Sequence, residues 1–75
     1  MMNLEIGDKV LIRNDLVLWG SYGTDSFVSG MMSMRGKVAT VTKVWPRDFQ
    51  IAECGFTWTP EMCVGKIIGN RVVKF

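Results

Sequence analysis

Residues 7–13 read Gly-Asp-Lys-Val-Leu-Ile-Arg, and residues 35–41 read Arg-Gly-Lys-Val-Ala-Thr-Val. Each segment places a turn-forming glycine ahead of a run of aliphatic and β-branched residues. Such residues favour strands, and glycine favours the tight turns that precede them. The two segments therefore predict two strands of a small, strongly curved β-barrel. A barrel of this size is filled by its own side chains, so we expect function on its outer surface and in its loops.

The composition indicates a single globular domain that spans residues 1–75. Hydrophobic residues make up 48% of the chain, which contains three Trp and four Phe and is therefore unlike a disordered segment. No apolar run approaches the roughly 20 residues that cross a bilayer. Residues 1–5 lack the basic and then apolar pattern of a secretion signal. We therefore expect cytoplasmic residence and no membrane partner.

Further strands are expected over residues 37–45, 49–54 and 56–59, each rich in residues that favour strands. In the first of these, Val38, Val41 and Val44 recur every third residue. Alternating side chains do not place all three on one face, so the spacing predicts a bulge or strong coiling. Gly55, together with Cys54, is expected to form a tight turn. Gly69-Asn70 between strand formers predicts a two-residue hairpin.

Two short helical segments are expected outside the strands. The connection over residues 14–34 is long for a compact domain, and its second half predicts one or two helical turns over residues 25–33. Met31, Met32 and Met34 then form either the buried face of that helix or an adaptable contact patch. Residues 60–62 read Pro-Glu-Met, which favours a single 3₁₀ turn with proline at its first position.

This pattern resembles known barrel families. Short strands, a long first loop with a helical turn, and a 3₁₀ turn before the last strand are typical of SH3-like barrels, so we expect a mainly β, SH3-like barrel of five or six strands. The two glycine-led segments also resemble KOW-type barrels, although the connection here is longer. Residues 6–62 are similar to short proteins of bacteriophages and prophages of Gram-positive bacteria. The likeness rests on Ile6-Gly7-Asp8-Lys9-Val10, Tyr22-Gly23, Phe27-Val28, Met31, Gly36-Lys37, Val41-Thr42, Trp58-Thr59 and Glu61-Met62.

Catalysis is not expected. The chain has no His, so Cys54 and Cys63 have no imidazole to activate them. The acidic residues show no paired spacing, and no phosphate-binding glycine loop is present. Two Cys without His or clustered carboxylates do not indicate a zinc site. We therefore predict no enzyme activity, no metal and no cofactor, and two free thiols that are at least partly buried.

The aromatic residues divide between the core and the first loop. Trp58 alternates with threonines in a predicted strand, and we expect it in the core. Trp19 lies among glycines, where it forms an exposed anchor or folds back onto the barrel. In SH3 domains the first loop borders a peptide groove, so we expect Asp15 and Asp25 to meet basic residues of a peptide. We therefore predict a protein-binding surface of Trp19, Tyr22 and Asp25, without the aromatic ladder that a proline-rich ligand needs.

The basic side chains support a second interpretation. The net charge is only +2, but residues 35–47 hold four basic and no acidic residues. Arg35, Lys37, Lys43 and Arg47, with Trp45 for stacking, either follow a DNA or RNA backbone or form an ordinary solvated strand face.

The resemblance favours a non-catalytic phage or prophage module that binds a host or phage protein and blocks a host enzyme such as a defence nuclease. Nucleic-acid binding is the alternative. We expect a monomer or a weak homodimer.

Overall fold

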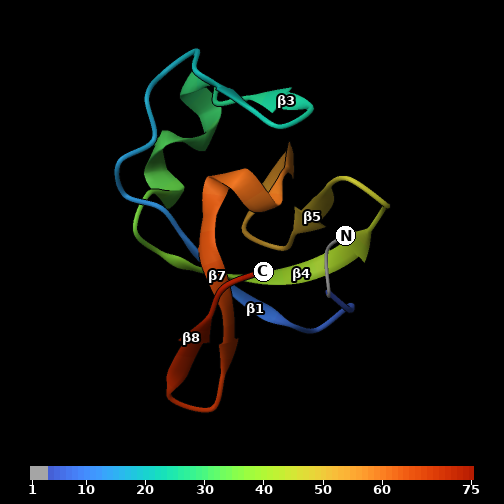
Figure 1. The fold of residues 1–75 in the computed structure, drawn as a ribbon. Helices are drawn as coiled ribbons and strands as arrows, with labels where there is room; N and C mark the ends of the chain where they lie inside the picture. Colours follow the sequence, from blue (N-terminus) through green and yellow to red (C-terminus); the bar gives the residue numbers. More distant parts are fainter. Residues whose placement is uncertain (1–3) are drawn as a thin grey trace.

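A computed structural model describes residues 4–75 (Figure 1). Residues 1–3, part of the stretch on which the absence of a secretion signal was predicted, lie outside the described residues. The elements in chain order are β1 (Lys9–Ile12), β2 (Ser21–Tyr22), β3 (Asp25–Ser26), the 3₁₀ helix η1 (Ser29–Met34), β4 (Val38–Val44), β5 (Phe49–Ile51), β6 (Cys54–Trp58), the 3₁₀ helix η2 (Pro60–Met62), β7 (Cys63–Ile68) and β8 (Arg71–Val73). None of the helical segments in residues 4–75 has the length and hydropathy needed for a bilayer crossing.

Six strands form one antiparallel sheet in the order β6-β5-β4-β1-β7-β8, and β2 and β3 form a separate two-stranded ribbon. The two glycine-led segments lie side by side in the sheet, with Val10 opposite Ala39. Both of these side chains are fully buried. The mainly β prediction is thus confirmed. Strands β6 and β8 are the two edges, so the pairings within the described chain leave the sheet open.

Strand β4 contains the predicted bulge. Its register against β5 shifts between Val41 and Lys43. Ala39 and Val41 point into the core by ordinary alternation, and the shift returns Val44 to the same side, where it packs on the core. Val38 falls on the opposite face and is exposed, so the bulge brings two of the three valines to the core.

The core is one cluster of apolar side chains drawn from strands on both sides of β1 and from the first loop. Trp58 is fully buried, as predicted, and Phe27 meets it edge-on with 6.4 Å between ring centroids. The edge-to-face geometry adds to the stabilisation from apolar burial. The cluster comprises Leu4, Val10, Ile12, Leu16, Phe27, Met31, Met34, Ala39, Val41, Phe49, Ile51, Trp58, Met62 and Cys63.

The helix predicted over residues 25–33 is wrong in position. Asp25–Ser26 is strand β3, and the helical segment is the 3₁₀ helix Ser29–Met34. Tyr22 pairs with Asp25 across the ribbon, so those residues are unavailable to a helix. Met31 and Met34 are buried, as expected for spacing three in a 3₁₀ helix, whereas Met32 lies on the exposed side.

Two predicted turns have different outcomes. The turn expected at Gly55 lies earlier, because Ile51 pairs with Cys54 and leaves residues 52–53 as the connection. The Glu53 carboxylate accepts a hydrogen bond of 3.1 Å from the Thr40 amide, which ties this turn to β4. The hairpin predicted at Gly69-Asn70 is confirmed, with Ile68 opposite Arg71. Gly69 has φ of 62°, as a primed hairpin turn requires.

Candidate functional site

The first loop holds Trp19 in an unusual backbone conformation. Trp19 has φ of 67°, and among the described residues it alone combines a side chain with a positive φ. Its amide donates to the Phe27 carbonyl at 2.6 Å, and the Phe27 amide donates to the Gly20 carbonyl at 2.9 Å. The Gly20 amide also donates to Val17 at 2.9 Å. These bonds offset the strain that a left-handed conformation imposes on a residue with a Cβ.

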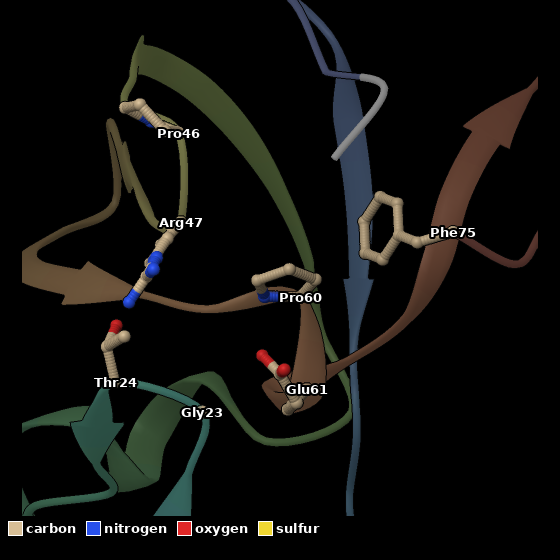
Figure 2. Close-up of a pocket in the computed structure, with 7 residues that line it drawn as sticks. All are labelled: Gly23, Thr24, Pro46, Arg47, Pro60, Glu61 and Phe75. Atoms are coloured by element: carbon tan, nitrogen blue, oxygen red, sulfur yellow. The ribbon is translucent and has the colours of Figure 1, made fainter. Parts of the chain in front are cut away.

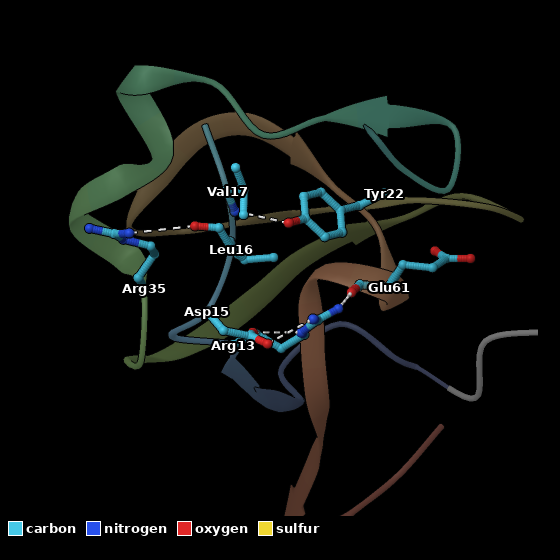
Figure 3. Close-up of polar contacts among 7 residues, drawn as sticks. All are labelled: Arg13, Asp15, Leu16, Val17, Tyr22, Arg35 and Glu61. Atoms are coloured by element: carbon cyan, nitrogen blue, oxygen red, sulfur yellow. Dashed lines mark hydrogen bonds and ion pairs between the residues drawn. The ribbon is translucent and has the colours of Figure 1, made fainter. Parts of the chain in front are cut away.

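Arg13 ties the start of this loop to η2 (Figure 3). Its guanidinium forms two hydrogen bonds with the Asp15 carboxylate, of 2.9 and 3.0 Å, and a third of 2.9 Å to the Glu61 carbonyl. The hydrogen bond between them raises the pKa of Arg13 and lowers the pKa of Asp15. Asp15, expected to meet basic residues of a partner, is thus already paired within the chain.

Tyr22 holds the loop from its other side. Its hydroxyl accepts a hydrogen bond of 2.9 Å from the Val17 amide, and its ring lies 5.5 Å from the Arg13 guanidinium carbon (Figure 3). The Tyr22 carbonyl accepts a 2.7 Å hydrogen bond from the Thr59 hydroxyl. Tyr22 is half-buried against the core. The structure therefore gives Tyr22 a positioning role in the loop that presents Trp19.

A further contact fixes the loop near its start. The Arg35 guanidinium donates to the Leu16 carbonyl at 3.4 Å, and the Leu16 side chain is buried in the core. Arg35, predicted for nucleic-acid binding, thus contacts the first loop at Leu16 (Figure 3). These side-chain contacts hold the first half of the loop at Asp15, Leu16 and Val17.

The loop exposes three consecutive apolar side chains. Trp19 is 68% exposed, Val17 is 64% exposed and Leu18 is also at the surface. Of the two alternatives for Trp19, an exposed side chain or one folded back onto the barrel, the structure has the exposed one. Asp25 is half-buried, and one of its carboxylate oxygens has no hydrogen-bond partner within residues 4–75. The apolar side chains that the loop exposes are accordingly those of Val17, Leu18 and Trp19, whereas Tyr22 and Asp25 are half-buried.

Sequence reasoning missed the residues that position the loop. Val17 and Leu18 belong to no motif, and the sequence predicts Thr59 as a strand residue and as part of the phage likeness, not as a hydrogen-bond donor to the loop. One signal was available: Arg13 and Asp15 are opposite charges two residues apart at the end of a strand. Their bidentate geometry depends on the chain turning outward at Asn14, which no local pattern specifies.

A shallow pocket of about 570 Å³ lies beside the same loop (Figure 2). Arg47 extends towards Thr24 from one side, and the Glu61 carboxylate faces the opening from η2. Within the described chain neither of these two charged groups forms an ion pair. Glu61 lies so close to Gly23 that a Cβ there would sit 2.5 Å from its Oε1. The lining consists of Gly23, Thr24, Pro46, Arg47, Pro60, Glu61 and Phe75.

The predicted basic residues separate into two groups. Arg35 and Lys37 precede β4, and Lys43, Trp45 and Arg47 lie at or beyond its far end. Lys43 follows Lys37 by six positions along the chain, or about 20 Å at strand spacing. At the far end, the Lys43 ammonium lies 5.3 Å from the centroid of the Trp45 ring. The two ends therefore do not form one continuous strand face.

Both cysteines are free thiols, half-buried at Cys54 and buried at Cys63. Burial raises the pKa of Cys63 to about 12, so this thiol stays protonated and unreactive near neutral pH. In residues 4–75 no group of three or more His, Cys, Asp or Glu side chains is placed to hold a metal ion.

Comparisons with protein-family models, with curated proteins and with solved structures found no match for this chain.

Proposed function

We propose that this chain is a non-catalytic protein-binding module whose first loop inserts Trp19 into an apolar pocket of its partner. The observation that carries the proposal is a largely exposed tryptophan held at a positive φ by backbone hydrogen bonds. Backbone strain of this kind persists only where the surrounding structure enforces it, and it concentrates at functional positions. Exposed aromatic anchors dominate the energetics of protein interfaces.

The size of the anchor supports a specific contact. A tryptophan side chain buries up to about 250 Å², and an exposed fraction of 68% leaves about 170 Å² available to a partner. At about 25 cal/mol per Å², burial of that area contributes about 4 kcal/mol. Because the Arg13, Tyr22 and Arg35 contacts already order the loop, little of this is lost to ordering on binding.

The proposed fold family is the SH3-like barrel. Supporting features are the central position of β1 between β4 and β7, the long first loop, and a 3₁₀ turn placed directly before β7. The proposed source is a phage or prophage of a Gram-positive bacterium, and the proposed action is occlusion of a host enzyme such as a defence nuclease. The sequence resemblance to short phage and prophage proteins supports this source and this action.

A capture experiment tests the proposal. The immobilised protein is incubated with lysate of a Gram-positive host, and retained proteins are identified. Trp19→Ala should weaken the interaction by about 30-fold or more, because about 2–4 kcal/mol of anchor burial is lost. Trp45→Ala is the matched control, since it removes a second surface tryptophan outside the loop. Equal retention by Trp19→Ala and the unmodified chain refutes the proposed anchor.

The alternative function is binding of DNA or RNA, and one observation favours it. The Lys43 ammonium lies over the Trp45 ring at the end of β4, and Arg47, two residues further along the chain, has no ion-pair partner within residues 4–75. Such a group offers two cations and a ring for stacking. Titration with single- and double-stranded oligonucleotides at two salt concentrations tests it. Salt-sensitive binding lost in the Lys43→Glu, Arg47→Glu double variant supports this alternative, and no binding at low salt refutes it.

A further inference from the structure

The C-terminal hairpin ends the sheet in an unpaired edge. Strand β8 has one neighbour, β7, and lies at the outer margin of the sheet (Figure 1). Among residues 4–75 its backbone forms no hydrogen bonds outside that pairing. Because Ile68 and Arg71 close a two-residue turn, they are the hydrogen-bonded pair, and alternation turns the N–H and C=O of Val72 away from β7. These groups are free to pair with another strand.

The edge is apolar on both faces. Val72 is 43% exposed and Val73 is 45% exposed, and their side chains point to opposite faces of the strand. Ile68 and Phe75, at the two ends of the hairpin arm, are also exposed. An added strand would therefore cover apolar area on either face of the sheet.

The charges near this edge have one sign. Arg71 and Lys74 flank the two valines, and residues 62–75 contain no acidic residue. Lys66, on the neighbouring strand β7, is not one of these edge cations, because its ammonium lies 3.5 Å from the Asp8 carboxylate. Pairing with a second copy of the same edge would bring four cations together without an anion. Like charges on adjacent strands are destabilising, whereas an acidic strand supplies the missing sign.

We propose that β8 is a docking edge for an extended partner segment in which acidic and apolar residues alternate. The main chain of that segment pairs with Val72, its apolar side chains cover Val72 or Val73, and its carboxylates meet Arg71 and Lys74. This surface is separate from the Trp19 loop, so the test of the docking edge is independent of the test of the proposed function.

A blocked synthetic hexapeptide of alternating glutamate and valine is the probe, added to ¹⁵N-labelled protein at low salt. We expect amide shifts confined to residues 64–75 and slower hydrogen exchange at the Val72 amide. A peptide with lysine in place of glutamate should bind at least about tenfold more weakly, as expected from two lost ion pairs and new like-charge contacts. Equal binding of the two peptides, or no shifts in β8 at millimolar peptide, overturns the proposal.

Two variants separate the backbone from the charges. Val72→Pro removes the outward N–H and leaves the β7 hydrogen bonds in place, so it should abolish binding, whereas Val72→Thr keeps the N–H and should bind normally. The Arg71→Glu, Lys74→Glu double variant should reverse the preference in favour of the lysine peptide. Retained binding by Val72→Pro contradicts the pairing. Sedimentation that shows dimers of the free protein, lost in Val72→Pro, would assign the edge to a second copy and also refute the proposal.

Discussion

Replacement of Trp19 by glycine and by alanine tests the strained loop directly. Both variants lose the same indole, so their difference isolates the backbone. At φ of 67° an alanine retains the left-handed strain of about 1–2 kcal/mol, which glycine avoids. Glycine loses more conformational freedom on folding, by about 0.5–1 kcal/mol. We therefore expect Trp19→Gly to be more stable than Trp19→Ala by about 0.5–1 kcal/mol.

Urea denaturation, followed by the fluorescence of the two remaining tryptophans, of which Trp58 is buried, measures this difference. Thermal unfolding should show a higher Tm for Trp19→Gly by about 2–8 °C, from the usual shift per kcal/mol in a domain of this size. At a position with ordinary φ the order is reversed, because alanine is then the more stable residue. An alanine variant equal to or more stable than the glycine variant would refute the strained conformation.

Substitutions at Trp58, Cys63 and Gly65, with Gly55 as a control position, test the core and the close approach of β8 to β7. Trp58→Ala should lower the free energy of unfolding by about 3–5 kcal/mol in urea denaturation. Trp58→Phe should lower it by only about 1–2 kcal/mol, because phenylalanine removes a buried indole N–H that has no partner in residues 4–75. Equal losses in the two variants would contradict this. The raised pKa of Cys63 means that its contribution to stability is present below pH 9 and lost as the pH rises towards 12. Cys63→Ala should flatten that alkaline loss, and alkylation at pH 8 should modify Cys54 first; faster modification of Cys63 would count against its burial. Gly65→Ala places a Cβ against the β8 backbone and should lower the free energy of unfolding by about 1–3 kcal/mol. Gly55→Ala, where a Cβ meets no neighbour, should be nearly neutral. Similar losses at the two positions would argue against the close approach of β8 to Gly65.

The parts of the fold that local residue patterns control could be predicted from the sequence. Glycine before aliphatic runs located β1 and β4, and Gly69-Asn70 located the last hairpin, because turn geometry depends on a few adjacent residues. The three-residue spacing of valines in β4 indicated a bulge, which the register shift after Val41 confirms. Pro60 fixed the start of η2.

The first loop could be predicted only in outline, because distant residues shape it. The Trp19 and Phe27 backbones are hydrogen-bonded next to the β2–β3 ribbon. Asp25 and Ser26, where we expected a helix to begin, therefore form strand β3. Met32 is exposed because the segment is a 3₁₀ helix with a three-residue repeat. The exposure of Trp19 was one of two open alternatives. The hydrogen bonds that hold Trp19 and its neighbour Gly20 join them to the Phe27 backbone, eight and seven residues along the chain, which no local pattern specifies.

Backbone ¹⁵N relaxation of the free protein tests most directly whether the loop is ordered before a partner binds. The amides of Trp19 and Gly20 should have order parameters near about 0.85, similar to those of β1 and β4, and should change little on binding. Values below about 0.6 at these two amides would mean that the indole is carried on a mobile tether, and would contradict the rigid anchor on which the proposed function depends.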